Sequence, residues 1–332
     1  MKKKKLIIRI VLLLVVCSVA ITAALIVRDR KTDFNHAEKS TVAMNTIMTQ
    51  KIYSDVPGSN ITDIITIVDV LENTISFKDD GSQLSALNRE GAFDSGIIAD
   101  VLEACLDVSE KSGGAFDVTV GKLSELWGIG TENERIPDAD EIAAVISECG
   151  YEKISLDGSS ISFDGDFSVD LGAVGKGMAC DYIMSYLKST KDVRGGVVSV
   201  GGSIVVYGQR NKAGDKWRVA VRHPRNEGEL LGVITLSEGF VSTSGDYERY
   251  FEEDGKRYHH ILDPQSGYPS DSDLISVTVV CDSGMLSDAL STACFVLGSE
   301  KGERLLAQYG ASGVFVDKDM NITTVGDIDF EY

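Results

Sequence analysis

The chain of 332 residues is short of cysteine, proline and basic residues, and each shortage narrows what it can be. Its six cysteines form no Cys-x-x-Cys pair, which argues against zinc. Only five of them lie beyond the apolar N-terminus, so no disulfide framework is expected, although a single disulfide stays open. With 5 prolines against 33 glycines, the turns should be mostly glycine turns.

The shortage of positive charge is most marked outside the N-terminus. Residues 1–30 contain seven basic residues and one acidic residue, so the rest of the chain has 25 basic and 50 acidic residues, a net charge of −25. This composition argues against nucleic-acid binding. A metal cation or a basic partner is more compatible with it.

Charge is absent altogether from one long stretch. Between Ile10 and Val27, 18 residues contain no charged side chain, which is about the minimum for a helix that spans a bilayer. We expect residues 1–30 to be a basic cytoplasmic segment followed by an uncleaved transmembrane signal anchor, with Lys2 to Lys5 on the cytoplasmic side. The rest of the chain would then lie on the extracytoplasmic side of the cytoplasmic membrane.

Two other fates of this segment stay open. A signal peptide could be cleaved after Thr22 and Ala24, which form a weak small-x-small site. A lipid could be attached at Cys17, although Val16 stands where a small residue is expected.

Beyond the anchor, the pattern predicts a polar linker over 31–43 and one domain over 44–332. A strand is expected over 42–55. Helical spacing appears over 61–71, 97–111, 138–149, 285–297 and 301–308, and short strands follow one another from about 195 to 281, with a last one over 313–317. No repeat of fixed period is present. These elements indicate an α+β (mixed α/β) fold rather than a regular doubly wound sheet.

The segment "VDLGAVGKGMACD", Val169 to Asp181, looks like a phosphate-binding loop that enters a helix. It lacks the spacing of a Walker A loop, and its glycines reverse the order of the Rossmann fingerprint. Glycines still allow a close approach of the backbone, and a helix N-terminus favours anions. The alternative is a strand-to-helix turn with a surface lysine.

Residues 112–130 combine aromatic side chains, several glycines and one carboxylate. Phe116 and Trp127 could form a platform for a ring beside Asp117, or they could be a buried pair in a packed loop.

Residues 288–298 place three oxygen-bearing side chains on one helix face. Asp288, Ser291 and Thr292 are spaced i, i+3 and i+4, a set of hard oxygen ligands that suits Mg²⁺. The same spacing is also found in ordinary polar stripes.

Residues 242–269 contain Asp246 and two adjacent histidines, His259 and His260. Neighbouring residues of a strand point to opposite faces, so one ring should face inward. That ring could be a general base or a hydrogen-bonded core histidine.

Taken together, these segments resemble the ApbE family of flavin transferases over about Thr41 to Phe330. The resembling elements occur in family order: "MNTIM", "LSALN", "GGAFDVTVGKLSELWG", "VDLGAVGKGMACD", "VSVGG", "TSGDYERYF", "HHILDPQSGYP" and "SDALSTACFVLG". The resemblance implies the ApbE fold, in which mixed β-sheets are flanked by helices.

The resemblance also implies an activity. Members of the family bind FAD and Mg²⁺ and attach FMN through a phosphoester bond to a Thr or Ser of a target protein, releasing AMP. Their targets include exported respiratory electron-transfer subunits and FMN-binding domains outside the membrane, which agrees with the expected anchor. This chain contains no acceptor-like Asp-x-x-Ser/Thr-Gly-Ala-Thr segment, so it should modify another protein. Two alternatives remain: a Mg²⁺-dependent FAD pyrophosphatase that gives FMN and AMP, and a non-enzymatic flavin-binding protein at the membrane.

The resemblance assigns roles to particular residues. His260 is the implied proton acceptor, with Asp246 as the second candidate. The implied flavin contacts are Met44, Phe77, Ala115, Phe116, Asp117, Asp170, Lys176 and Ile261, and the implied Mg²⁺ ligands are Ala173 and Ser291 through their carbonyls, Asp288 and Thr292.

Overall fold

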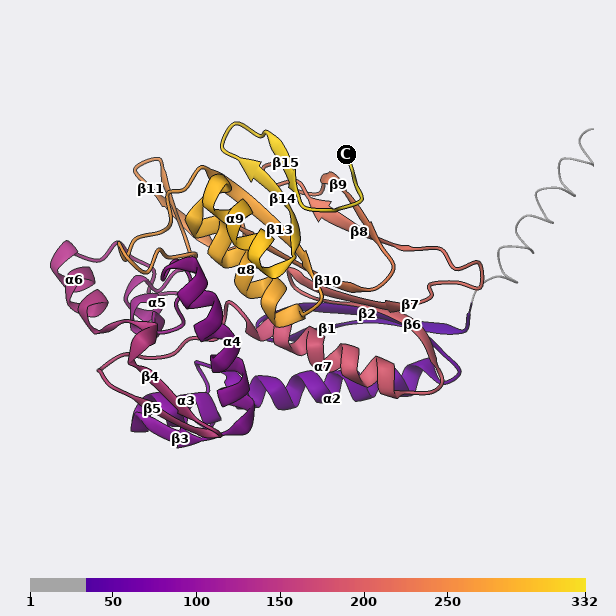
Figure 1. The fold of residues 1–332 in the computed structure, drawn as a ribbon, viewed down its shortest axis with the longest axis horizontal. Coiled ribbons are helices and arrows are strands. Elements are labelled where there is room, and N and C mark those ends of the chain that lie inside the picture. Colours follow the sequence, from indigo (N-terminus) through magenta and orange to yellow (C-terminus); the bar gives the residue numbers. More distant parts are fainter. Residues whose placement is uncertain (1–33) are drawn as a thin grey trace, which may run out of the picture.

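The computed structural model describes residues 34–332, and its centre is a sheet of eight strands (Figure 1). In order across the sheet these are β1 (His36–Ala43), β2 (Thr46–Ser54), β6 (Val193–Val200), β7 (Ser203–Gly208), β10 (Gly239–Gly245), β13 (Leu274–Cys281), β14 (Ser312–Asp317) and β15 (Ile322–Val325). Each neighbouring pair is antiparallel.

Helices cover one face of this sheet. They are α2 (Pro57–Ile75), α7 (Gly175–Ser189), α8 (Gly284–Leu297) and α9 (Ser299–Tyr309), with α4 (Gly96–Ser112) packed on α8 (Figure 1). The apolar residues of α2 recur every three or four positions, and Ile61, Ile64, Val68 and Leu71 are all buried. Pro57 stands in its first turn, where no backbone donor is needed.

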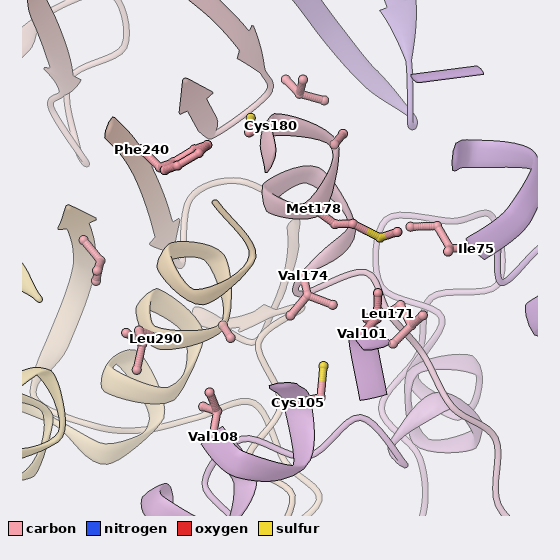
Figure 2. Close-up of a cluster of buried hydrophobic side chains, with 14 of the residues drawn as sticks. Ile75, Val101, Cys105, Val108, Leu171, Val174, Met178, Cys180, Phe240 and Leu290 are labelled. Carbon is pink, nitrogen blue, oxygen red and sulfur yellow. The ribbon is translucent and has the colours of Figure 1, made fainter. Parts of the chain in front are cut away.

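The main core lies between these helices and the sheet. Figure 2 shows part of it, where Cys105 of α4, Leu290 of α8 and Phe240 of β10 lie around the first turns of α7. Val174, the residue before α7, and Met178 of α7 extend into the same cluster. The N-terminus of α7 is therefore held in place by packing on several sides.

A small sheet covers the other face of the eight-stranded sheet. It consists of β16 (Phe330–Glu331), β9 (Leu230–Leu236) and β8 (Trp217–Arg222). In β8 buried and exposed residues alternate, so Trp217, Val219 and Val221 all point inward and pack in a cluster with Tyr53 and Val206.

Short elements complete the described part of the chain. These are α3 (Gln83–Glu90), β3 (Ala92–Asp94), α5 (Gly121–Trp127), α6 (Ala139–Glu148), a 3₁₀ turn (Tyr151–Lys153), β4 (Ile154–Asp157), β5 (Ser160–Phe163), β11 (Tyr250–Glu253) and β12 (Lys256–His259). A third cluster, centred on Trp127, Leu123 and Ile142, joins α5 and α6.

The α+β class and the five helices expected from spacing are confirmed. The helices expected over 61–71, 97–111, 138–149, 285–297 and 301–308 correspond to α2, α4, α6, α8 and α9. The strand expected last is β14, but two further strands follow it. All five cysteines in the described part of the chain are free.

Three expectations need correction. The segment 31–43 is not a linker from His36 onward, because β1 pairs with β2 along all eight of its residues. Its polar sequence fits an edge strand, which has one neighbour and leaves most of its side chains in solvent. The strand expected over 42–55 is interrupted by a turn at Met44 and Asn45, whose φ angles are 50° and 55°. The sheets expected to be mixed are antiparallel wherever named strands pair.

The transmembrane anchor expected over 1–30 lies outside the described residues. Within 34–332, no helix is both long and apolar enough to cross a membrane.

Candidate active site

A cavity of about 930 Å³ opens where one end of the large sheet meets the helices. Its walls come from the β1–β2 turn, the C-terminal end of α2, residues 115–120, the first turn of α7, the end of β10, the chain after β12, and α8. This volume is at the upper end of the range of small-molecule pockets, about 300–1,000 Å³.

The cavity brings together most of the residues that the sequence singled out, although they lie far apart in the chain. Those that line it are Met44, Phe77, Ala115, Phe116, Asp117, Asp170, Ala173, Lys176, His260, Ile261, Asp288 and Thr292. Asp246 and Ser291 do not line it.

The first turn of α7 carries the cationic side of the cavity. Lys176 Nζ lies 3.5 Å from Asp288 Oδ2 and donates a hydrogen bond to the Gly172 carbonyl at 3.1 Å. The loop before the helix is fixed by Asp170, whose Oδ1 accepts a hydrogen bond from Gly172 N at 2.8 Å. Phosphate oxygens in this part of the cavity would meet both the ammonium group and a helix N-terminus.

The face of α8 supplies oxygen atoms to the cavity. Asp288 Oδ2 accepts a hydrogen bond from Gly177 N at 2.9 Å, so the carboxylate is already held beside α7. The hydroxyl of Ser244, on β10, lies 3.2 Å from Thr292 Oγ1 and 2.7 Å from Ser291 Oγ. Ser291 is fully buried and also donates to the Asp288 carbonyl, which explains why its side chain takes no part in the cavity wall.

These oxygens fit Mg²⁺ better than a softer metal. In the part of the chain that the structure describes, no group of three or more His, Cys, Asp or Glu residues converges on a point. One carboxylate with hydroxyl and carbonyl oxygens is the incomplete hard-oxygen set that Mg²⁺ uses when substrate phosphates supply further ligands. Asp288, Thr292 and Ala173 would hold such an ion.

Asp117 mainly orders the loop that forms one wall. Its Oδ1 accepts hydrogen bonds from the Thr119 backbone N–H at 2.8 Å and hydroxyl at 2.7 Å, and its Oδ2 accepts one from Tyr151 N at 3.0 Å. Burial raises the pKa of this carboxyl above its ordinary value, against the hydrogen bonds that lower it.

Both aromatic rings of the 112–130 segment are buried. Phe116 and Trp127 are 2% and 0% exposed, and Trp127 Nε1 donates to the Gly267 carbonyl at 2.8 Å. Their burial is therefore confirmed, but Phe116 belongs to the main core and Trp127 ends α5 in the third cluster, and both residues border the cavity.

His260 is placed and protonated as a proton acceptor should be. Its Nδ1 lies 3.3 Å from the Arg249 carbonyl, which can only accept, so Nδ1 carries the hydrogen and Nε2 keeps its lone pair. Desolvation lowers the pKa of the ring below its ordinary value, and His259, Lys176 and Arg249 add to this effect. Because His260 is exposed at the cavity, solvent screening limits the size of this shift, and its direction leaves the ring neutral near pH 7.

The neighbouring histidine, His259, lies in the core and not at the cavity. His259 is buried at the end of β12, where its Nε2 donates to the Ser270 carbonyl at 3.0 Å and its ring packs edge-on against Phe295. The inward-facing ring is therefore a hydrogen-bonded core histidine, and the ring at the cavity is the outward-facing one of His260.

Asp246 is not brought to the cavity. Its two carboxylate oxygens bind the Arg225 guanidinium at 2.7 and 2.8 Å, and Arg257 lies 3.7 Å away. Both of its oxygens are occupied by arginine donors, and the ion pair joins the end of β10 to the β8–β9 connection.

Sequence reasoning missed several residues of the cavity wall. Glu72 accepts a hydrogen bond from Met44 N at 2.7 Å and so fixes the β1–β2 turn, but no local pattern relates positions 28 residues apart. Ser244 could have been found, because strand alternation places it with Ser242 on the side that meets α8.

The comparisons with known proteins agree with this site. The model of the ApbE family matches residues 44–315. The FAD:protein FMN transferase of Treponema pallidum (strain Nichols) is 32% identical over 323 residues, which cover 89% of this chain and 87% of the relative. The protein of the same name from Escherichia coli (strain K12) is 35% identical over 230 residues, or 67% of this chain and 65% of the relative.

Solved structures show the same likeness. The ApbE protein of Thermotoga maritima MSB8 superimposes with a TM-score of 0.81 and 30% identity, covering 88% of this chain and 97% of that chain. The flavinyl transferase ApbE of Pseudomonas stutzeri, in its apo form, gives a TM-score of 0.79 and 30% identity, covering 89% and 95%. The matched range and the identity across most of both chains show that this chain belongs to the ApbE family.

Proposed function

We propose that this chain is a Mg²⁺-dependent FAD:protein FMN transferase that joins FMN to a Thr or Ser hydroxyl of another protein and releases AMP. The observation that carries the proposal is the convergence of Lys176, Asp288 and the neutral ring of His260 on one cavity wide enough for a dinucleotide. The names of the family relatives support the same activity.

The chemistry is the exchange of one phosphoryl bond for another. The acceptor oxygen forms a bond to the FMN phosphorus, and the bond from that phosphorus to the oxygen of the AMP phosphate breaks. His260 Nε2 is the group that takes the hydroxyl proton, because its lone pair is free and its ring is neutral. Lys176 offsets the negative charge that collects on the departing phosphate. A Mg²⁺ ion held by Asp288, Thr292 and Ala173 would supply further stabilisation of phosphate charge.

The acceptor distinguishes transfer from hydrolysis. We would incubate the full-length chain with FAD, MgCl₂ and an exported FMN-binding domain, and then run a denaturing gel. Flavin fluorescence that remains on the acceptor demonstrates transfer, and an acceptor whose target Thr is replaced by Val is the matched control. Free FMN and AMP with no labelled acceptor would instead establish a pyrophosphatase, in which water replaces the hydroxyl.

The same mixture tests the need for the cation. EDTA should stop both labelling and AMP release, and excess MgCl₂ should restore them. FAD that stays bound and intact under all conditions would contradict an enzymatic role and identify a flavin carrier.

We further propose that residues 1–30 anchor the chain and that the domain works on the extracytoplasmic side of the membrane. The 18 uncharged residues and the basic N-terminus support this arrangement. External protease added to intact spheroplasts should then degrade the domain, and protection until lysis would contradict the proposal.

A further inference from the structure

Helices α7 and α8 pack against each other, and their crossing point lies at two glycines in their first turns, Gly177 and Gly284. A Cβ atom added to Gly177 would lie 2.1 Å from the Gly284 carbonyl oxygen. A Cβ atom added to Gly284 would lie 2.3 Å from the Gly177 carbonyl oxygen. Only glycine at both positions allows this approach, so the crossing point is defined by backbone contact on both sides.

At this crossing each helix has an aspartate whose carboxylate accepts hydrogen bonds from the N-terminal end of the other helix. Asp288 of α8 accepts a hydrogen bond from Gly177 N, in the first turn of α7. Asp181 of α7 accepts hydrogen bonds from Gly284 N at 2.7 Å, Met285 N at 2.8 Å and the Ser283 hydroxyl at 3.2 Å, at the start of α8.

The sequence contains the same spacing on both sides of these reciprocal hydrogen bonds. The segments "GMACD" (177–181) and "GMLSD" (284–288) each place an aspartate four residues after the crossing glycine. This spacing puts each carboxylate one turn along its own helix and beside the first turn of the other.

The two carboxylates differ in what lies on their other side. Asp288 lines the cavity next to Lys176, whereas Asp181 does not line it and binds only the N-terminus of α8 within the described chain. Both Asp181 oxygens are used there, by donors that would otherwise be unpaired at a helix N-terminus.

We propose that Asp181 is a positioning residue for the cation site: by clamping the start of α8 onto α7, it fixes Asp288 and Thr292 relative to Ala173 and Lys176. The inference rests on the proposed function, because it concerns the Mg²⁺ ligands named there. The physical basis of the inference is that these four residues belong to two helices. Asp288 and Thr292 lie on α8. Lys176 lies on α7, and Ala173 lies in the loop before it. Charge-assisted hydrogen bonds at a helix N-terminus give the direction and the rigidity that such a junction needs.

The test compares Asp181→Asn with Asp138→Ala in the full-length chain. Asparagine offers one acceptor oxygen and turns an amide donor toward a backbone donor, so the clamp is weakened without a change of size. Asp138 caps α6 and has no connection to α8, so its replacement removes a helix cap of similar kind away from the cation site.

The readout is the rise in Tm as MgCl₂ is titrated into each protein in the presence of FAD. We expect the midpoint of the Mg²⁺ titration to rise about tenfold or more for Asp181→Asn, as when an indirect partner of a metal ligand is removed. The Tm shift caused by FAD without Mg²⁺ should stay unchanged, and Asp138→Ala should lower the starting Tm and leave the midpoint in place.

An unchanged midpoint in Asp181→Asn, with only a lower starting Tm, would overturn the inference and leave Asp181 as an ordinary helix cap. If that variant does not fold, Ser283→Ala removes one donor of the clamp together with the cap that this hydroxyl forms with Leu286 N, and the midpoint should move in the same direction by a smaller factor. No movement there would also overturn it. These readouts need no acceptor protein, so failure of FMN transfer contradicts the proposed function and not the role of Asp181.

Discussion

At the scale of single residues, Lys176 is the cation that the structure places beside Asp288 at the cavity wall. Its replacement by Met removes the charge and keeps most of the side-chain volume. Because the charge acts on phosphate oxygens as they become more negative, kcat/KM for FMN transfer should fall by about 10²–10³.

Lys122→Met is the matched control for this change. Lys122 forms an ion pair with Asp166 at the surface and does not line the cavity, so transfer should remain close to wild type. A Lys176→Met protein with wild-type kcat/KM would contradict the assignment of this residue.

His260 gives a prediction about pH. Its pKa is lowered in the folded chain, so the neutral ring persists below the ordinary value of about 6.5. The acidic limb of kcat/KM should therefore lie below pH 6.5, and His260→Gln should lower the rate at every pH and remove that limb. A wild-type limb at or above 6.5 would contradict the lowered pKa of His260, and an acidic limb that persists unchanged in His260→Gln would contradict its role as the proton acceptor.

The same shift has a consequence for stability. Between the folded pKa and about 6.5, the unfolded chain binds more protons than the folded chain, so the free energy of unfolding falls as the pH falls through this window. His260→Gln should make this decline shallower, which urea titrations at pH 5 and pH 7 can measure.

At the scale of elements, the α7–α8 crossing leaves no room for a side chain at Gly177. In Gly177→Ala the new methyl group meets backbone rather than a flexible side chain, so the helices must separate. We expect the free energy of unfolding to fall by about 1–3 kcal/mol. We also expect kcat/KM for FMN transfer to fall, because the groups on the two helices move apart.

Gly58→Ala in α2 is the control for helix glycines. No heavy atom lies within 4 Å of the position that its Cβ would take, so this change should be neutral or slightly stabilising. Equal unfolding curves for Gly177→Ala and wild type would show that the crossing is less tight than the structure has it.

At the scale of the whole molecule, the cavity is assembled from segments between Met44 and Thr292. Ligands that bind only the folded chain should therefore stabilise all of these segments together. At a fixed concentration of MgCl₂, adding FAD at about 100 times its Kd should raise the free energy of unfolding by about 2.7 kcal/mol in a single thermal transition. Two transitions, one of them insensitive to ligand, would show that the cavity wall unfolds in separate parts.

The same distribution explains what the sequence could and could not predict. The Asp288, Ser291 and Thr292 spacing predicted one helix face, and the structure places two of the three at the cavity. The sequence could not show that the hydroxyl of Ser291 is turned toward Ser244 of β10, because helical spacing does not reveal which flank of a buried helix faces another element. The role of the Ser291 carbonyl stays a prediction.

Asp246 shows that the sequence does not reveal ion-pair partners that lie far away in the chain. Its sequence neighbourhood did not contain Arg225, which lies 21 residues earlier and occupies both of its oxygens. The strand β1 was missed for a related reason: an edge strand with a polar face carries a weak pattern of its own and is defined by its partner β2. Long-range pairing decided each of these cases, and local pattern could not reveal it.

The clamp between Asp181 and Gly284 also determines when, during synthesis, the α7–α8 contact can first form. The two residues are 103 positions apart, so at usual synthesis rates the second half of the clamp emerges about 5 to 20 seconds after the first. Until then Lys176 and the loop before it exist without the oxygens of α8. A nascent chain thus contains Lys176 early, but it cannot form the proposed cation site until α8 has been synthesised.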